Sequence, residues 1–129
     1  MTRAIKLDLD GTFEVFDLGA YPHLKEVIGA YFDVVWVNGP IASHPKQITV
    51  GIAVDDEGLL KQLKVNKLAC SLYGIFVMAE SPLVGTAVVI ASDYEGETVD
   101  VPDWVVQLVS TIYNCTAEAF KYHQNWRMN

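Results

Sequence analysis

The chain has few cysteines and no long hydrophobic run, and each of these absences excludes a class of protein. Its 129 residues include only two cysteines, Cys70 and Cys115, which cannot form a disulfide framework. No segment reaches the length of about eighteen uninterrupted apolar residues that a membrane-spanning helix needs. The N-terminus lacks the basic and then apolar pattern of a signal peptide, so we expect both cysteines to be reduced thiols.

Basic residues and metal-ligand patterns are also scarce. Nine lysines and arginines stand against sixteen aspartates and glutamates, which gives a formal net charge of −7. Such a surface repels phosphate backbones, so the composition argues against general binding to nucleic acids. The three histidines are dispersed, and no zinc-ligand spacing exists, so we expect no metal site. The sequence also lacks a phosphate-cradling glycine loop, and we expect no cofactor.

Alternating apolar residues predict β-strands over much of the chain. The expected strands cover residues 3–9, 13–18, 32–37, 47–54 and 84–91. Asp10-Gly11 separates the first two and is typical of a tight hairpin turn, because glycine adopts positive φ at little cost. The last run is almost continuously apolar, which is typical of a central strand covered on both faces.

Helical signals separate and follow these strands. A short helix is expected from Pro22, and a second one over Lys67 to Tyr73, with Asn66 as its N-cap and Gly74 as its stop. The longest helix is expected to begin near Pro102 and to carry one apolar stripe, made of Val105, Leu108, Val109, Ile112, Thr116, Ala119 and Phe120.

Together these elements predict one compact α+β domain that spans residues 1–129. We expect a mixed, largely antiparallel sheet of about five strands, with the long C-terminal helix packed on one face. The high apolar fraction of 51% and the sheet edges also predict self-association. The aromatic residues on the flanks of the last helix cannot all face one core, and a homo-oligomer would bury some of them: Trp104, Tyr113, Tyr122 and Trp126.

The segment Asp8-Leu9-Asp10-Gly11-Thr12 resembles the first motif of phosphatases of the haloacid dehalogenase type. The resemblance implies that Asp8 is a nucleophile and Asp10 a general acid, with Asp55-Asp56 as a magnesium-binding pair. That motif follows a buried parallel strand, which needs a long crossover connection before its partner. Here strand-like sequence resumes at once, so we favour a hairpin with Asp10 in its turn.

A charged stretch between two apolar segments, residues 55–74, contains the candidate binding residues. Lys64 and Lys67 supply cationic groups, Asn66 marks a helix start, and Tyr73 offers a ring for stacking. Such a set predicts a site for a small anion, because helix N-termini favour negative charge. The alternative is that the lysines are solvated and that Asn66 only caps the helix.

Three motifs in this region and after it carry a second resemblance. They are Val-Asp-Asp-Glu-Gly-Leu-Leu-Lys (54–61), Leu-Lys-Val-Asn-Lys-Leu-Ala (63–69) and Val-Gly-Thr-Ala-Val-Val-Ile (84–90). With the strands before them, they resemble a family of small proteins of unknown function from bacteriophages and other mobile elements. The resemblance implies a phage origin, a cytoplasmic site of action in the infected host cell, and an accessory or host-interaction role. It carries no catalytic residue.

These observations lead to two functional hypotheses of different classes. The favoured one is a non-enzymatic phage accessory protein that binds a host protein or a small anionic, nucleotide-like ligand, with counter-defence as a role. The ligand-binding residues would be Lys64, Asn66, Lys67 and Tyr73. The alternative is a small magnesium-dependent, haloacid-dehalogenase-like phosphatase that uses Asp8 and Asp10.

Overall fold

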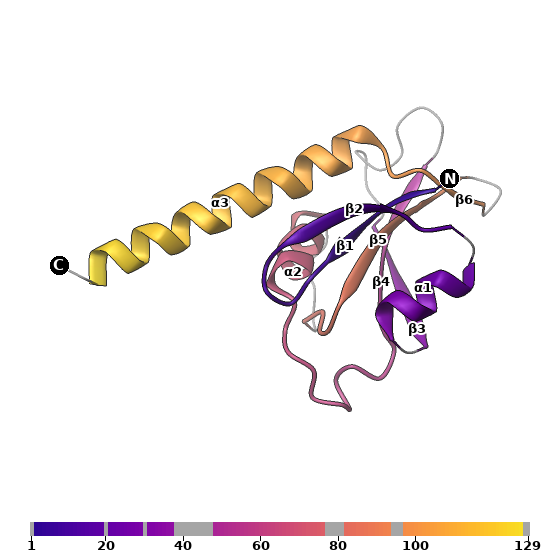
Figure 1. The fold of residues 1–129 in the computed structure, drawn as a ribbon, viewed down its shortest axis with the longest axis horizontal. Helices are drawn as coiled ribbons and strands as arrows, with labels where there is room; N and C mark the ends of the chain where they lie inside the picture. Colours follow the sequence, from indigo (N-terminus) through magenta and orange to yellow (C-terminus); the bar gives the residue numbers. More distant parts are fainter. Residues whose placement is uncertain are drawn as a thin grey trace.

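A computed structural model describes residues 2–19, 21–29, 31–37, 48–76, 82–93 and 97–127. Within these residues the chain forms six β-strands and three α-helices (Figure 1). The strands are β1 (Arg3–Leu7), β2 (Phe13–Asp17), β3 (Phe32–Val37), β4 (Thr49–Asp55), β5 (Ala87–Ser92) and β6 (Thr98–Val99). The helices are α1 (Tyr21–Ile28), α2 (Lys67–Phe76) and α3 (Asp103–Arg127).

The strands form one sheet in the order β2-β1-β5-β4-β3, and the short β6 pairs with the end of β5. Every pairing among the described strands is antiparallel. The prediction of a largely antiparallel sheet in an α+β domain is therefore confirmed. The expected parallel component is not found among these strands.

Helices cover both faces of the sheet, and this explains the apolar run of β5. On one face Ile5, Leu7 and Val89 are fully buried against α2 and the first turns of α3. On the other face Val88 is fully buried in a second cluster that includes Leu24 of α1. The predicted packing of the C-terminal helix on one face is confirmed, and β5 is covered on both faces as expected for a central strand.

The hairpin between β1 and β2 forms where the sequence predicts it. The amide of Asp8 donates to the carbonyl of Thr12 at 2.9 Å, and Gly11 has a φ of +89°. The strands end earlier than expected, at Leu7 and Asp17.

Three other boundaries differ from the prediction. Gly74 does not stop α2, because its φ is not positive and the helix continues to Phe76. The strand expected from residue 84 begins at Ala87, and Val84 instead forms an isolated bridge with Val65. Helix α1, expected to begin at Pro22, begins one residue earlier, at Tyr21.

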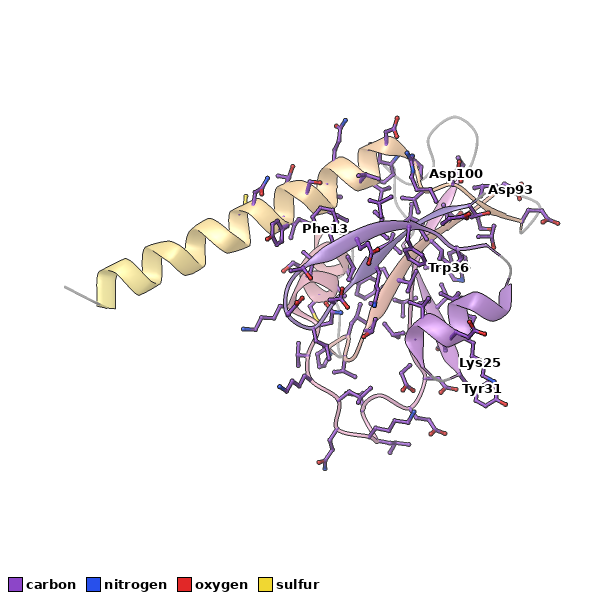
Figure 2. All side chains as sticks on the ribbon, viewed as in Figure 1. Phe13, Lys25, Tyr31, Trp36, Asp93 and Asp100 are labelled. Atoms are coloured by element: carbon purple, nitrogen blue, oxygen red, sulfur yellow. The ribbon has the colours of Figure 1, made fainter. Side chains whose placement is uncertain are left out.

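Helix α3 begins beside the N-terminal strand and then extends past the sheet (Figure 1). Its start is held by an ion pair of 2.8 Å between the Arg3 guanidinium and the Asp103 carboxylate. Farther along, the Tyr113 ring meets the Phe13 ring edge-on, with centroids 5.6 Å apart, and Phe13 lies near α3 in Figure 2. Val105 and Val109 are buried, so the first half of the predicted apolar stripe faces the core. The side chains of Tyr122 and Trp126 lie outside the described part.

None of the helices in the described residues is both long enough and apolar enough to cross a lipid bilayer.

Candidate functional site

The loop between β4 and α2 is held in shape by the carboxylate of Asp55, the last residue of β4. One oxygen accepts a hydrogen bond from the Glu57 amide at 2.8 Å, and the other forms an ion pair with Lys61 Nζ at 2.8 Å. The hydrogen bond from Lys61 and then that from Glu57 lower the pKa of Asp55, and the carboxylate in turn raises the pKa of Lys61. Because the Asp55 side chain is only 6% exposed, the loop is tied to the core at this point.

Close packing and backbone hydrogen bonds fix the rest of the loop. A Cβ atom on Gly58 would lie 2.7 Å from Cγ2 of Val84, so only glycine fits there without movement of its neighbour. The Leu63 amide donates to the Gly58 carbonyl at 3.1 Å, and Gln62 has a φ of +58°, which is uncommon for a residue with a side chain. The loop therefore has a defined conformation.

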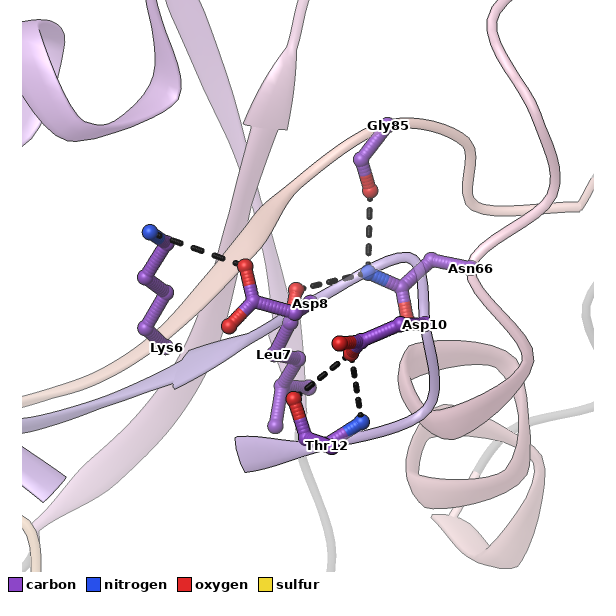
Figure 3. A network of polar contacts seen from close by, with 7 residues as sticks. All are labelled: Lys6, Leu7, Asp8, Asp10, Thr12, Asn66 and Gly85. Carbon is purple, nitrogen blue, oxygen red and sulfur yellow. Dashed lines mark hydrogen bonds and ion pairs between the residues drawn. The ribbon is translucent and has the colours of Figure 1, made fainter. Parts of the chain in front are cut away.

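Asn66 joins three segments and is fully buried. Its side-chain nitrogen donates to the carbonyls of Leu7 and Gly85, both at 2.9 Å (Figure 3). Its side-chain oxygen accepts a hydrogen bond of 3.0 Å from the Ala69 amide, which confirms the predicted N-cap of α2. Both donors of the amide are thus used inside the protein, and the side chain is closed to solvent. The geometry therefore gives Asn66 a structural role in place of the predicted ligand contact.

The other three predicted binding residues differ in their surroundings. Lys64 and Lys67 are exposed, and neither forms an ion pair within the described residues. Tyr73 is half-buried and packs against the core cluster beneath α2 and α3. Six residues along a helix correspond to a rotation of roughly 240° from Lys67, so the ring lies on a different side of α2.

Exposed apolar residues lie next to these lysines, and the sequence analysis did not single them out. Leu59 is 60% exposed, Leu60 is 84% exposed and Val65 is 47% exposed. In the sequence, the only indication of this exposed surface is a pair of leucines directly after an acidic turn. The same pattern equally well predicts one turn of a buried helix. We call the exposed apolar residues of this loop, together with the two exposed lysines beside them, the loop surface: Leu59, Leu60, Lys64, Val65 and Lys67.

The phosphatase-like motif lies in the β1–β2 hairpin (Figure 3). The Asp8 carboxylate lies 3.5 Å from Lys6 Nζ. Asp10 accepts hydrogen bonds from the Thr12 hydroxyl at 2.6 Å and the Thr12 amide at 3.0 Å, and these bonds lower the pKa of Asp10. The predicted hairpin is confirmed, with Asp10 in its turn. Among the residues that the structure describes, no three acidic, histidine or cysteine side chains are grouped so as to hold a metal ion.

These features define a small antiparallel α+β domain with a rigid, partly apolar surface loop. Residues 1–114 match the model of a family described as a domain of unknown function (DUF3846), and the chain belongs to that family. Comparison with curated proteins and with solved structures found no match. The match confirms the expected family of unknown function, and it ends within α3, shortly after the turns that pack on the core.

Proposed function

We propose that this protein is a non-enzymatic binding protein whose loop surface docks on a protein of the host cell. The observation that carries the proposal is the exposure of Leu59 and Leu60 on a loop that is otherwise tightly held. Burial of one leucine side chain contributes about 1.5–3 kcal/mol, so two adjacent leucines can supply much of a binding free energy. Little conformational freedom remains to be lost, because the loop is already ordered.

The lysines of the loop surface indicate the chemistry of the partner. Lys64 and Lys67 lie on either side of Val65 and Asn66 in the sequence, and both are exposed. Opposite charges at the rim of an interface steer association and fix its register. We therefore expect a partner that presents an apolar pocket with carboxylates facing Lys64 and Lys67. The exposed Asp56 and Glu57 precede the leucines in the same loop, and they would disfavour carboxylates on their side of the pocket.

The biological setting is part of the same proposal. The resemblance of the three motifs to proteins of bacteriophages and mobile elements supports a phage origin, a cytoplasmic site of action and an accessory or counter-defence role. The alternative within the binding class is a small anionic ligand held by Lys64, Lys67 and Tyr73. The described structure favours a protein partner, because Tyr73 lies on a different side of α2 from Lys67.

The experiment is affinity capture from a host lysate, with mass spectrometry of the captured proteins and of released small molecules. The wild-type protein is compared with the Leu59→Ser/Leu60→Ser variant and with Val15→Ser, a matched control because Val15 is 41% exposed on β2. A protein captured by the wild type and by the control but not by the double variant supports the proposal. Equal capture by all three contradicts it. A small molecule lost only in Lys64→Ala/Lys67→Ala would favour the anionic ligand instead.

Self-association is a further part of the proposal. Strands β2 and β3 lie at the two ends of the strand order β2-β1-β5-β4-β3. Exposed sheet edges favour pairing with another chain. Trp104 and Tyr113 are partly buried against the core of the same chain, so they support self-association less than the sequence predicts. Sedimentation at micromolar concentration is expected to show a dimer or a larger species, and a monomer alone would contradict this part.

A further inference from the structure

We propose that a pocket between α1 and the sheet binds a small, neutral aromatic molecule that carries one hydrogen-bonding group. The pocket has a volume of about 300 Å³ and lies on the face opposite α2 and α3. Its lining includes Leu18, Leu24, Val34, Trp36 and Ile90. No residue of the loop surface lines it, so this inference is independent of the proposed function.

The position of Trp36, which lines the pocket, depends on the absence of a side chain at Gly51. Strand register places Gly51 between Trp36 of β3 and Ile90 of β5. A Cβ atom on Gly51 would lie 2.7 Å from Cε3 and 2.9 Å from Cζ3 of Trp36, so the indole ring lies directly against the backbone of β4. The ring is 42% exposed, and Figure 2 shows it between α1 and the end of the sheet near Asp93. This arrangement supports a flat ligand that stacks on or beside the indole.

Two hydroxyl groups give the pocket one polar end. Ser92 and Thr98 lie opposite each other where β5 pairs with β6, and both line the pocket. The Ser92 hydroxyl donates to the Asp93 carbonyl at 3.2 Å, so its oxygen remains an acceptor. The Thr98 hydroxyl forms no hydrogen bond within the described residues, and Thr98 is exposed at the rim. These groups suit a single hydroxyl or N–H on the ligand.

The charge and the size of the pocket restrict the ligand further. None of the described lining residues is charged, so these residues offer a charged ligand no ion-pair partner. The volume lies at the lower end of the range of about 300–1,000 Å³ that is usual for ligand pockets. A molecule of one or two rings therefore fits, whereas a nucleotide would find no cationic partner for its phosphate among the described lining residues.

The test is a titration of the full chain, labelled with ¹⁵N, with 4-methylphenol as the probe. The indole N–H resonance of Trp36 is assigned by its loss in Trp36→Phe, which separates it from the other two tryptophans. We expect this resonance to shift in a saturable way. Toluene, which lacks the hydroxyl, should bind about five- to tenfold more weakly, as expected for the loss of one hydrogen bond. 4-Methylbenzoate, which is charged, should give no saturable shift.

Two variants decide between a specific pocket and non-specific contact. Val34→Phe adds a ring to the pocket wall and should abolish saturable binding of 4-methylphenol. Thr98→Val removes the polar group at an exposed strand end, and it should lower the affinity for 4-methylphenol to that for toluene. This second variant tests the proposal even if Val34→Phe does not fold. Equal affinities for toluene and 4-methylphenol, or binding that neither variant changes, would overturn the proposal.

Discussion

The side-chain nitrogen of Asn66 lies 2.9 Å from the carbonyl oxygen of Leu7, a residue 59 positions earlier in the chain. The same nitrogen donates to the Gly85 carbonyl, so one amide connects the end of β1, the start of α2 and the segment before β5 (Figure 3). Asn66 is fully buried, and no water is needed to complete its hydrogen bonds. This amide is therefore a structural link on which the placement of the whole loop depends.

The first prediction is that Asn66→Ala strongly destabilises the fold. The substitution removes the cap of α2 and leaves two buried carbonyls without their donor. Loss of a cap costs about 1 kcal/mol, and each unsatisfied buried group costs about 1–3 kcal/mol, so we expect a loss of at least about 3 kcal/mol in unfolding free energy. Urea unfolding followed by circular dichroism measures this change.

Two controls separate the roles of Asn66. Asn66→Ser keeps an oxygen that can cap α2 but lacks the side-chain amide that donates to the carbonyls of Leu7 and Gly85. It should therefore recover only about 1 kcal/mol of the lost unfolding free energy. Lys67→Ala changes the neighbouring exposed residue and should alter stability by no more than about 0.5 kcal/mol. If Asn66→Ala were as stable as Lys67→Ala, the structural role assigned to the amide would be wrong.

Asn66 also shows how far the sequence could predict the site. Its position before a helical segment is a local signal, and the N-cap it predicts is present. Its bonds to Leu7 and Gly85 join distant segments, so the pattern could not reveal that the side chain is buried and closed to a ligand. Local spacing likewise grouped Tyr73 with the lysines, although the ring packs against the core.

The fold shows the same difference between local patterns, which the sequence reveals, and contacts between distant segments, which it does not. The hairpin and the antiparallel class follow from local alternation and from Asp10-Gly11, and both are confirmed. The run from Val84 predicted one longer strand, but Gly85 has a φ of +79° and interrupts it. The exposure of Leu59 and Leu60 depends on how the loop is tied by Asp55, and no periodicity in the sequence reports that contact.

The second prediction concerns the pH dependence of stability. Lys61 and the Glu57 amide lower the pKa of Asp55 in the folded protein. The unfolded chain therefore binds a proton at this residue at a higher pH, near the ordinary value of about 3.9. The ionised Asp55 carboxylate therefore stabilises the fold above about pH 4, and this contribution is lost as the pH falls through the lower folded-state pKa.

Asp55→Asn isolates this contribution from those of the other acidic residues. Because Lys61 is 43% exposed and partly screened by solvent, we expect the variant to be only about 1 kcal/mol less stable near neutral pH. The difference from wild type should shrink at about pH 3, and urea unfolding at several pH values measures it. Lys61→Met should show the same trend, and the double variant should be less destabilised than the sum of the two single changes. A difference that stays constant across this pH range would contradict the prediction.

The third prediction compares two glycines with opposite environments. A Cβ atom at Gly51 would lie 2.7 Å from both Trp36 and Val34, so Gly51→Ala should cost about 1–3 kcal/mol through overpacking. A Cβ atom at Gly74 meets nothing within 4 Å, and the residue lies inside α2. Gly74→Ala should therefore stabilise the protein by about 0.5–1 kcal/mol. Thermal unfolding of the two variants measures both effects, and a stabilising Gly51→Ala would refute the proposed contact with Trp36.

The fourth prediction is that Asp8 and Asp10 do not catalyse phosphate ester hydrolysis. Asp8 follows a strand whose two neighbours, β2 and β5, are both antiparallel to it, whereas the phosphatase motif follows a parallel strand. A general acid also needs a raised pKa so that it carries a proton near neutral pH. The hydrogen bonds from Thr12 lower the pKa of Asp10, so its carboxylate is ionised under those conditions.

The measurement is release of nitrophenol from p-nitrophenyl phosphate by the purified protein in the presence of magnesium. We expect the wild-type protein to show the same rate as Asp8→Asn and Asp10→Asn, at the level of the buffer. The Asp8→Asn variant is the informative control, because it removes the would-be nucleophile while keeping the size of the side chain. Turnover by the wild type that Asp8→Asn abolishes would restore the phosphatase alternative. Turnover that persists in both variants would show that neither carboxylate is required, and the activity would then come from another site or from a contaminating enzyme.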